Sequence, residues 1–246
     1  MGFFVPGTAL TGLLSKLPIR IRWPRLRPIG RALIVINVLV FILQWASGGP
    51  NSNLLNLLFA LWPPQAGAPH FHGWQVLTYG FLHASWVHLL LNMFGLYMFG
   101  SHVERWLGAR RFLVYYLLCV IGAALLHLSI VAIAGRPPLP MVGASGGIFG
   151  LLLAFGMAFP KRKVLSLIPP MIAPAWLFVA FYALIELLMG VTQTLAGVAH
   201  FAHLGGMVTG FVIILYWRGR RRTRRGWRAS ERIAARWRWR TRAPPR

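Results

Sequence analysis

The sequence predicts an all-α, polytopic membrane protein built as a bundle of six transmembrane helices. The chain of 246 residues is 57% hydrophobic and has a mean hydropathy of +0.61, which exceeds what the core of a soluble domain needs. Its apolar residues gather in six runs. Its positive charges alternate from loop to loop in the way that membrane topology requires.

The six apolar runs are the expected spans. They cover residues 32–46, 87–100, 112–134, 145–159, 171–189 and 198–217. The second and fourth are shorter than the roughly 20 residues that cross a bilayer. We expect the second to extend at one end and the fourth to begin below the membrane surface, because irregular backbone at depth is tolerated where protein or water surrounds it. The chain thus divides into a basic N-terminal segment (1–31), a six-span domain (32–217) and a tail (218–246).

The positive charges predict the orientation. Of the 26 Lys and Arg, 25 lie in the two terminal segments and in the second and fourth loops, which predicts that both termini are cytoplasmic. The uncharged loop 47–86, rich in Trp, Phe and Pro, fits the outer interface, with an ordinary extracytoplasmic loop as the alternative. The bare six-span plan suggests a bacterial inner (cell) membrane.

The tail holds thirteen Arg interleaved with Trp. We expect it to bind anionic lipid at the cytoplasmic surface, with an amphipathic helix over 227–240; solvated disorder is the alternative. The net charge of +23 is also typical of nucleic-acid binding. That partner is less favoured, because the charges follow the topology of the spans.

Four polar residues fall at one depth of the predicted bundle. His88 and Asn92 are four residues apart in the second span and share one helix face. Ser145 begins the fourth span and His203 lies about 7 Å below the outer end of the sixth. Since all three spans run inward, these groups share the outer layer. A Ser, a His and hydrogen-bond donors are the groups that acyl transfer needs, so His88 and Asn92 are candidate oxyanion donors.

The candidate nucleophile is Ser145, at a helix N-terminus where backbone N–H groups are free. Gly143 and Gly146 leave room for a close approach to it. His203 is the candidate general base, and His200, one turn outward, is the alternative. Paired glycines in the fourth and sixth spans, at 146–147 and 205–206, allow these helices to pack closely.

Elimination favours a Ser–His dyad. The chain has no Asp, which excludes an aspartyl protease and a Ser-His-Asp triad, and no His-Glu-x-x-His motif of a zinc protease. None of its three Glu is expected at the site: Glu186 matches no motif, Glu231 lies in the tail, and Glu104 is expected to pair with Arg105 as a structural contact. The histidines that could surround a metal lack a carboxylate or thiol, so neither a metal nor an organic cofactor is expected; they are His70, His72, His83 and His88.

These residues resemble the rhomboid family of intramembrane serine proteases over about residues 74–210. The matching pieces, in order, are Trp74…Leu77-Thr78…Phe81-Leu82-His83, His88-x-x-x-Asn92-Met93, Glu104-Arg105-x-x-Gly108, Gly143-x-Ser145-Gly146 and Ala202-His203-x-Gly-Gly206…Gly210. Each piece is weak alone, but their order, spacing and membrane context together are specific.

The resemblance implies a six-helix core with Ser145 as nucleophile and His203 as base. It implies an oxyanion site made by His88, Asn92 and the Ser145 backbone. It also implies that residue 149 packs beneath the catalytic imidazole; this chain has Phe149 where the family often has Tyr. The expected substrates are single-span membrane proteins. The alternatives are a catalytically silent relative that binds membrane helices, against which intact Ser145 and His203 argue, and a small transporter.

Overall fold

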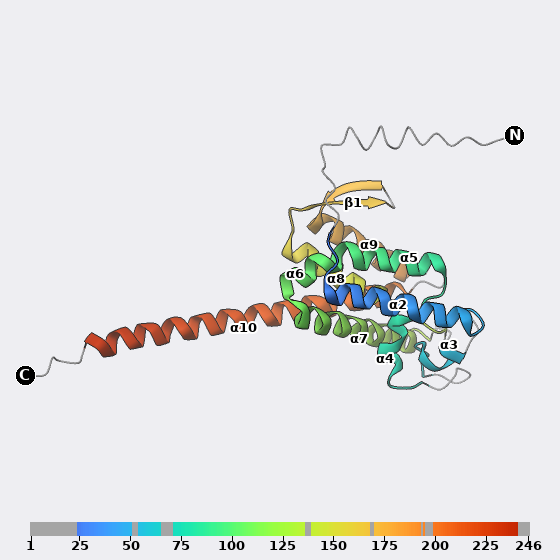
Figure 1. Cartoon of the computed structure of the whole chain (residues 1–246), viewed down its shortest axis with the longest axis horizontal. Coiled ribbons are helices and arrows are strands. Elements are labelled where there is room, and N and C mark those ends of the chain that lie inside the picture. The colour runs from blue at the N-terminus through green and yellow to red at the C-terminus, as the bar shows by residue number, and fades with distance from the viewer. Residues whose placement is uncertain are drawn as a thin grey trace, which may run out of the picture.

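The computed structural model describes residues 24–50, 54–64, 71–135, 139–167, 170–192, 194 and 199–240. Within these residues the chain forms a helical bundle, from which the C-terminal helix projects (Figure 1). The helices are α2 (Pro28–Ala46), α3 (Leu54–Phe59), α4 (Gln75–Thr78), η1 (Tyr79–Phe81), α5 (Trp86–Gly95), η2 (Leu96–Gly100), α6 (Ser101–Leu107), α7 (Ala109–Ile133), α8 (Ser145–Ala158), α9 (Ala175–Thr192) and α10 (His200–Arg240). Two strands, β1 (Lys163–Leu167) and β2 (Pro170–Pro174), form an antiparallel hairpin.

The surface of the bundle is apolar, as a lipid-facing surface must be. Large aliphatic side chains such as Leu43, Leu90, Leu188 and Val212 are more than half exposed. A soluble protein rarely leaves so many apolar side chains in water. The helices α2, α7, α9 and residues 200–220 of α10 are each long and apolar enough to cross a membrane. The prediction of an all-α membrane bundle is therefore confirmed.

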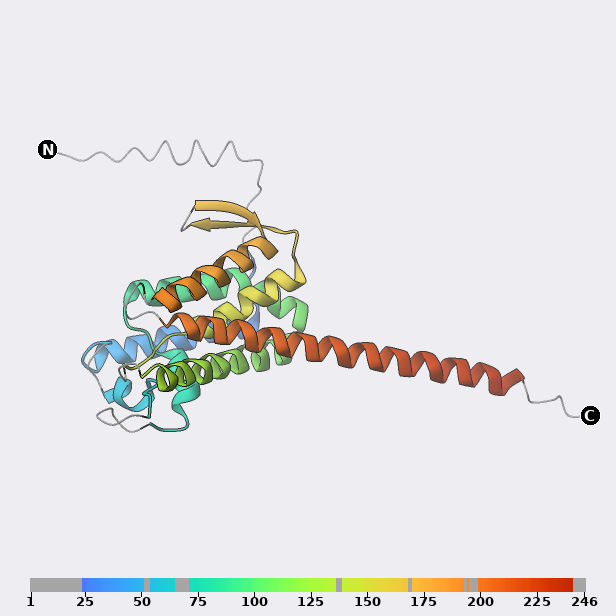
Figure 2. The same cartoon turned by 180° about the vertical axis from the view of Figure 1, so that it is seen from behind.

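The two shorter predicted spans differ from these four helices. The second corresponds to α5, η2 and α6, which follow one another without a gap from Trp86 to Leu107 and include a π-helical segment. This agrees with the expected extension at one end. The fourth corresponds to α8, which has only 14 residues and lies in the middle of the bundle (Figure 2). The total of six spans stays a prediction, because four helices meet the length and composition of a span.

The start of the fifth span was predicted wrongly. Residues 171–174 belong to strand β2, where Met171 pairs with Ser166, and α9 begins at Ala175. Hydropathy alone did not separate the strand from the helix, because Met171, Ile172 and Ala173 continue the apolar run. Pro174 marks the change physically, since proline is tolerated before the first turn of a helix and not inside it.

The sixth predicted span corresponds to residues 200–220 of a longer helix. The helix α10 continues beyond residue 217 to Arg240 without a break. The helix expected over residues 227–240 is thus the last part of α10, and not a separate element. Figure 2 shows this part pointing away from the bundle.

Glycines bring α8 and α10 into close contact. A Cβ atom on Gly206 would overlap the carbonyl oxygen of Gly146, and one on Gly150 would lie 3.2 Å from the Gly206 carbonyl oxygen. The predicted close packing of these two helices is confirmed. Gly205 faces α7 instead, where its Cβ would lie 2.9 Å from the Gly122 carbonyl oxygen. The contact between α8 and α10 matters for the site because Ser145 and His203 lie on these two helices.

Glu104 caps a helix that is distant in the sequence. Its Oε2 accepts a hydrogen bond from the backbone N–H of Gly30 at 2.9 Å, and its Oε1 accepts one from Ile29 at 3.2 Å. Both donors belong to the first turn of α2, where N–H groups have no partner within the helix. The expected structural role is thus present, but the partner is the start of α2. Arg105 is exposed.

We expect Glu104→Ala to lower the free energy of unfolding by roughly 1–3 kcal/mol, because a buried and a half-buried N–H group lose a charged acceptor. Thermal unfolding in detergent measures this as a lower Tm. Arg105→Ala, on the adjacent exposed position, is the matched control and should leave the Tm unchanged. Equal unfolding temperatures for Glu104→Ala and the wild type would contradict the capping role.

Candidate active site

Ser145 is the first residue of α8, and the loop before it is held by backbone hydrogen bonds. Met141 and Leu61 exchange two such bonds, each of 3.0 Å. The N–H of Gly143 donates to the carbonyl of Tyr79 at 3.0 Å. Gly143 has a φ of +127°, a conformation that favours glycine. The loop therefore fixes the position from which the Ser145 side chain projects.

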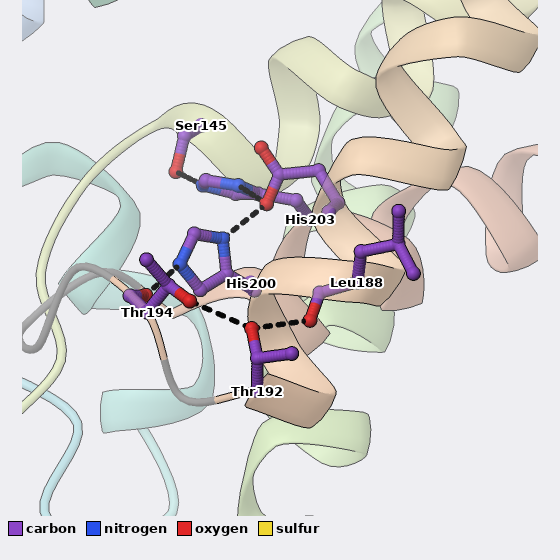
Figure 3. A network of polar contacts seen from close by, with 7 residues as sticks. Ser145, Leu188, Thr192, Thr194, His200 and His203 are labelled. Carbon is purple, nitrogen blue, oxygen red and sulfur yellow. Dashed lines mark hydrogen bonds and ion pairs between the residues drawn. The ribbon is translucent and has the colours of Figure 1, made fainter.

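Ser145 and His203 form a direct hydrogen bond. The distance from His203 Nε2 to Ser145 Oγ is 2.8 Å, although 58 residues separate them (Figure 3). His203 is on the first turn of α10 and is 9% exposed. Phe149, one turn after Ser145, stacks on the His203 imidazole, with ring centroids 4.2 Å apart and planes 5° from parallel. The placement of Phe149 against this ring is as the resemblance implied.

The other ring nitrogen of His203 faces Glu186. His203 Nδ1 lies 2.9 Å from Glu186 Oε2, which is an ion-pair distance. Glu186 comes from α9 and is 8% exposed. The expectation that no Glu lies at the site was therefore wrong. An ionisable residue in an apolar helix was the signal that could have revealed it.

His200 contacts the same carboxylate oxygen. Its Nδ1 lies 2.7 Å from Glu186 Oε2, and its Nε2 lies 3.0 Å from the carbonyl oxygen of Thr194. Figure 3 shows His200 beside His203, with only His203 joined to Ser145. The geometry therefore favours His203 over His200 as the partner of the serine.

His88 borders the serine from α5. A Cβ on Gly143 would lie 2.7 Å from His88 Nε2 and 3.8 Å from Ser145 Oγ, so both atoms lie next to Gly143. The backbone N–H of Ala84 donates to His88 Nδ1 at 3.4 Å. In the neutral imidazole, an accepting Nδ1 leaves the proton on Nε2, the atom at Gly143. His88 thus presents a hydrogen-bond donor beside Ser145.

Asn92 lies one turn further along α5. Its side-chain amide donates to the carbonyl of His88 at 2.8 Å, and the residue is buried. Among the residues that the structure describes, no hydrogen bond joins Asn92 to Ser145. The structure brings six of the seven predicted site residues together, as the Ser145–His203 pair and four residues around it, and Asn92 is linked to them through His88. The six are Ser145, His203, His88, Gly143, Gly146 and Phe149.

His83 lies behind His88, with ring centroids 5.2 Å apart. Burial, together with the proximity of His88, lowers the pKa of His83 to about 3. His83 is therefore neutral at physiological pH and adds no positive charge next to His88.

The structure groups other possible metal ligands than the four histidines that the sequence analysis named. His70 lies outside the described residues, and His72 stacks on Trp74 with centroids 4.3 Å apart. Ligand atoms of Glu186, His200 and His203 instead lie within 4.8 Å of one another. These three groups could hold a metal ion, but they also satisfy one another, since Glu186 Oε2 contacts both imidazoles.

Comparison with known proteins identifies the family. The family model of the rhomboid domain matches residues 70–220, which contain every predicted site residue. The chain belongs to the rhomboid family. It is 33% identical over 147 residues to RHOMBOID-like protein 4 of Arabidopsis thaliana, covering 57% of this chain and 33% of that protein. It is 34% identical to mitochondrial Rhomboid protein 1 of Saccharomyces cerevisiae, covering 55% and 39% of the two chains.

Some relatives in the family are named as proteases. Rhomboid protease GluP of Bacillus subtilis is 29% identical, covering 72% of this chain and 32% of that protein. This chain thus spans about a third of the length of the Arabidopsis and Bacillus proteins and 39% of the length of the yeast protein. Relatives named for mitochondria and chloroplasts also match, so membership does not itself assign a bacterial membrane.

Proposed function

We propose that this rhomboid protein is an intramembrane serine endopeptidase that cleaves membrane proteins through Ser145 and His203. The observation that carries the proposal is the 2.8 Å contact between Ser145 Oγ and His203 Nε2 inside an apolar bundle. Polar groups are costly in such surroundings, and a nucleophile within hydrogen-bond reach of a base is the arrangement that acyl transfer needs.

The reaction follows from the protons at the site. His203 accepts the proton of Ser145 at Nε2 while Ser145 Oγ attacks a substrate carbonyl carbon. The resulting oxyanion is stabilised by the Ser145 backbone N–H, by His88 Nε2–H and by the side-chain amide of Asn92. His203 then gives its proton to the leaving amine, which leaves an acyl-enzyme on Ser145. Water, activated by the same imidazole, hydrolyses this ester.

The substrates we propose are single-span membrane proteins. A segment in a regular helix keeps its carbonyls hydrogen-bonded, so a substrate must unwind locally before Ser145 can reach one. No metal ion or organic cofactor has a role in this reaction.

Reconstituted protein tests the proposal. Wild-type enzyme in proteoliposomes should cut a model single-span substrate, and the masses of the two fragments should place the cut in or beside its membrane segment. Substrate that binds but stays intact would instead support the catalytically silent alternative.

We expect His88→Ala to lower kcat by about 10- to 1,000-fold, in line with the loss of one oxyanion donor. Asn92→Ala should have an effect in the same direction, because it removes the other side-chain donor of the proposed oxyanion site. Initial rates at several substrate concentrations measure kcat. His102→Ala, on α6 and half-buried, is the matched control. A His88→Ala enzyme with the kcat of the wild type would remove His88 from the oxyanion site.

We further propose that both termini are cytoplasmic in a bacterial inner membrane, and that the tail is a lipid anchor. Attraction of Arg to anionic lipid is on the order of 1 kcal/mol per residue near the surface and weakens as salt screens it. Truncation after Arg220 should therefore leave specific activity in neutral detergent within about threefold, since it removes no group of the site. The excised peptide should bind anionic vesicles and dissociate as salt rises. A truncated enzyme that is folded but inactive would contradict this role.

A further inference from the structure

Glu186 is the only carboxylate that the described residues place at the site. The chain has three Glu and no Asp, and Glu104 accepts hydrogen bonds from the first turn of α2. Glu186 projects from α9, an otherwise apolar helix, and is buried. A buried carboxylate costs free energy unless polar partners surround it. Its partners here are two imidazoles, and one of them belongs to the proposed general base.

The contact with His203 orders the protons of that ring. The negative charge of an ionised carboxylate favours a proton on the nearer ring nitrogen, so in the neutral ring of His203 the proton lies on Nδ1, 2.9 Å from Glu186 Oε2. Nε2 then presents its lone pair to Ser145 Oγ. When Nε2 accepts the serine proton, the imidazolium that forms lies next to the carboxylate, which stabilises its charge.

His200 holds the carboxylate from another side. Since a carbonyl oxygen cannot donate, the His200 Nε2 that contacts Thr194 carries a proton. His200 Nδ1 contacts the Oε2 atom that also faces His203. Because an ionised Glu186 only accepts, His200 Nδ1 is the donor in this contact and holds the carboxylate oxygen in place. Together with Phe149, which stacks on the face of the His203 ring, Glu186 leaves the base little freedom to rotate.

We infer that Glu186 is a positioning residue for His203. The dyad is then part of a buried chain of polar contacts that runs from Ser145 through His203 and Glu186 to His200. The inference rests on the proposed function and deepens it. Glu186 acts through the base alone and does not touch the substrate. Its removal should therefore slow the chemical step and leave substrate binding unchanged.

The test compares Glu186→Gln with the wild type in the proteoliposome assay. We expect kcat to fall by about 10- to 1,000-fold, less than the roughly 10,000-fold known for the carboxylate of a soluble triad, while KM stays within about threefold. Glu186→Asp keeps the charge and should recover part of the lost kcat. Glu104→Gln is the matched control, because it changes the other buried glutamate at a distance from the site and should leave kcat unchanged. A chelator in every assay excludes an effect of metal bound by the same three groups.

The outcomes separate this inference from the proposed function. Inactive, folded wild-type enzyme contradicts the proposed function itself. Active wild type together with a folded Glu186→Gln variant whose kcat is within threefold contradicts only the role of Glu186. If Glu186→Gln does not fold, Glu186→Asp decides, because its side chain keeps the charge but is one methylene too short to hold the carboxylate at His203 Nδ1. A lower kcat with unchanged KM then supports the positioning role, and wild-type kcat overturns it.

Discussion

Replacing Ser145 or His203 with alanine is expected to lower kcat by about 10,000-fold or more, because each change removes a group that takes part directly in bond making. Cleavage of a single-span substrate in proteoliposomes measures the loss. The two residues act as a unit, joined by a 2.8 Å contact. The double variant should therefore be no slower than either single variant.

His200→Ala separates the two candidate bases. His200 contacts Glu186 and Thr194, so its removal should weaken activity less than His203→Ala does. Circular dichroism and the Tm in detergent confirm that each variant folds. An active His203→Ala enzyme beside an inactive His200→Ala enzyme would assign the base to His200 instead. Substantial activity in Ser145→Ala would contradict the assignment of the nucleophile.

The second large effect is expected from Gly206→Ala. The added methyl group would overlap the carbonyl oxygen of Gly146 and lie 2.8 Å from its carbonyl carbon. Backbone atoms cannot rotate away, so α8 and α10 must move apart, and with them Ser145 and His203. A displacement of 1 Å can cost about 100-fold in rate. We therefore expect kcat to fall by about 100-fold and the free energy of unfolding by roughly 1–3 kcal/mol.

Gly219→Ala is the control for this prediction. Gly219 lies in the same helix, and a Cβ there would meet no atom within 4 Å. Alanine favours the helix by about 1 kcal/mol over glycine, so this variant should keep full activity and at least the wild-type Tm. Wild-type activity in Gly206→Ala would show that the spacing of α8 and α10 does not control the site.

The membrane class and the grouping of the site residues could be predicted from the sequence. Apolar runs reveal lipid-facing helices, and the direction of each run gives the depth of its polar residues. Ser145, His203 and His88 each lie in the first turn of a helix. Their depths in the predicted spans were therefore enough to predict that they share one site. The small residues at 146 and 206 predicted the contact that makes this possible.

Glu186 was missed because it belongs to no motif, although its place toward the outer end of the fifth apolar run was a signal. It lies six residues before the end of α9, and His203 lies in the first turn of α10, so the two meet where the chain reverses. The cap of α2 by Glu104 could not be predicted, since its donors are about 75 residues away. The hairpin of β1 and β2 was hidden because its second strand is as apolar as the helix that follows.

A fluorophosphonate, which reacts with an activated serine, tests the catalytic role of Ser145 most directly. Purified wild-type protein in detergent is treated with the probe, and peptide mass spectrometry locates the adduct. We expect a single adduct on Ser145 that is absent from Ser145→Ala and forms far more slowly in His203→Ala. An adduct at another residue, or equal labelling of Ser145→Ala, would contradict that role.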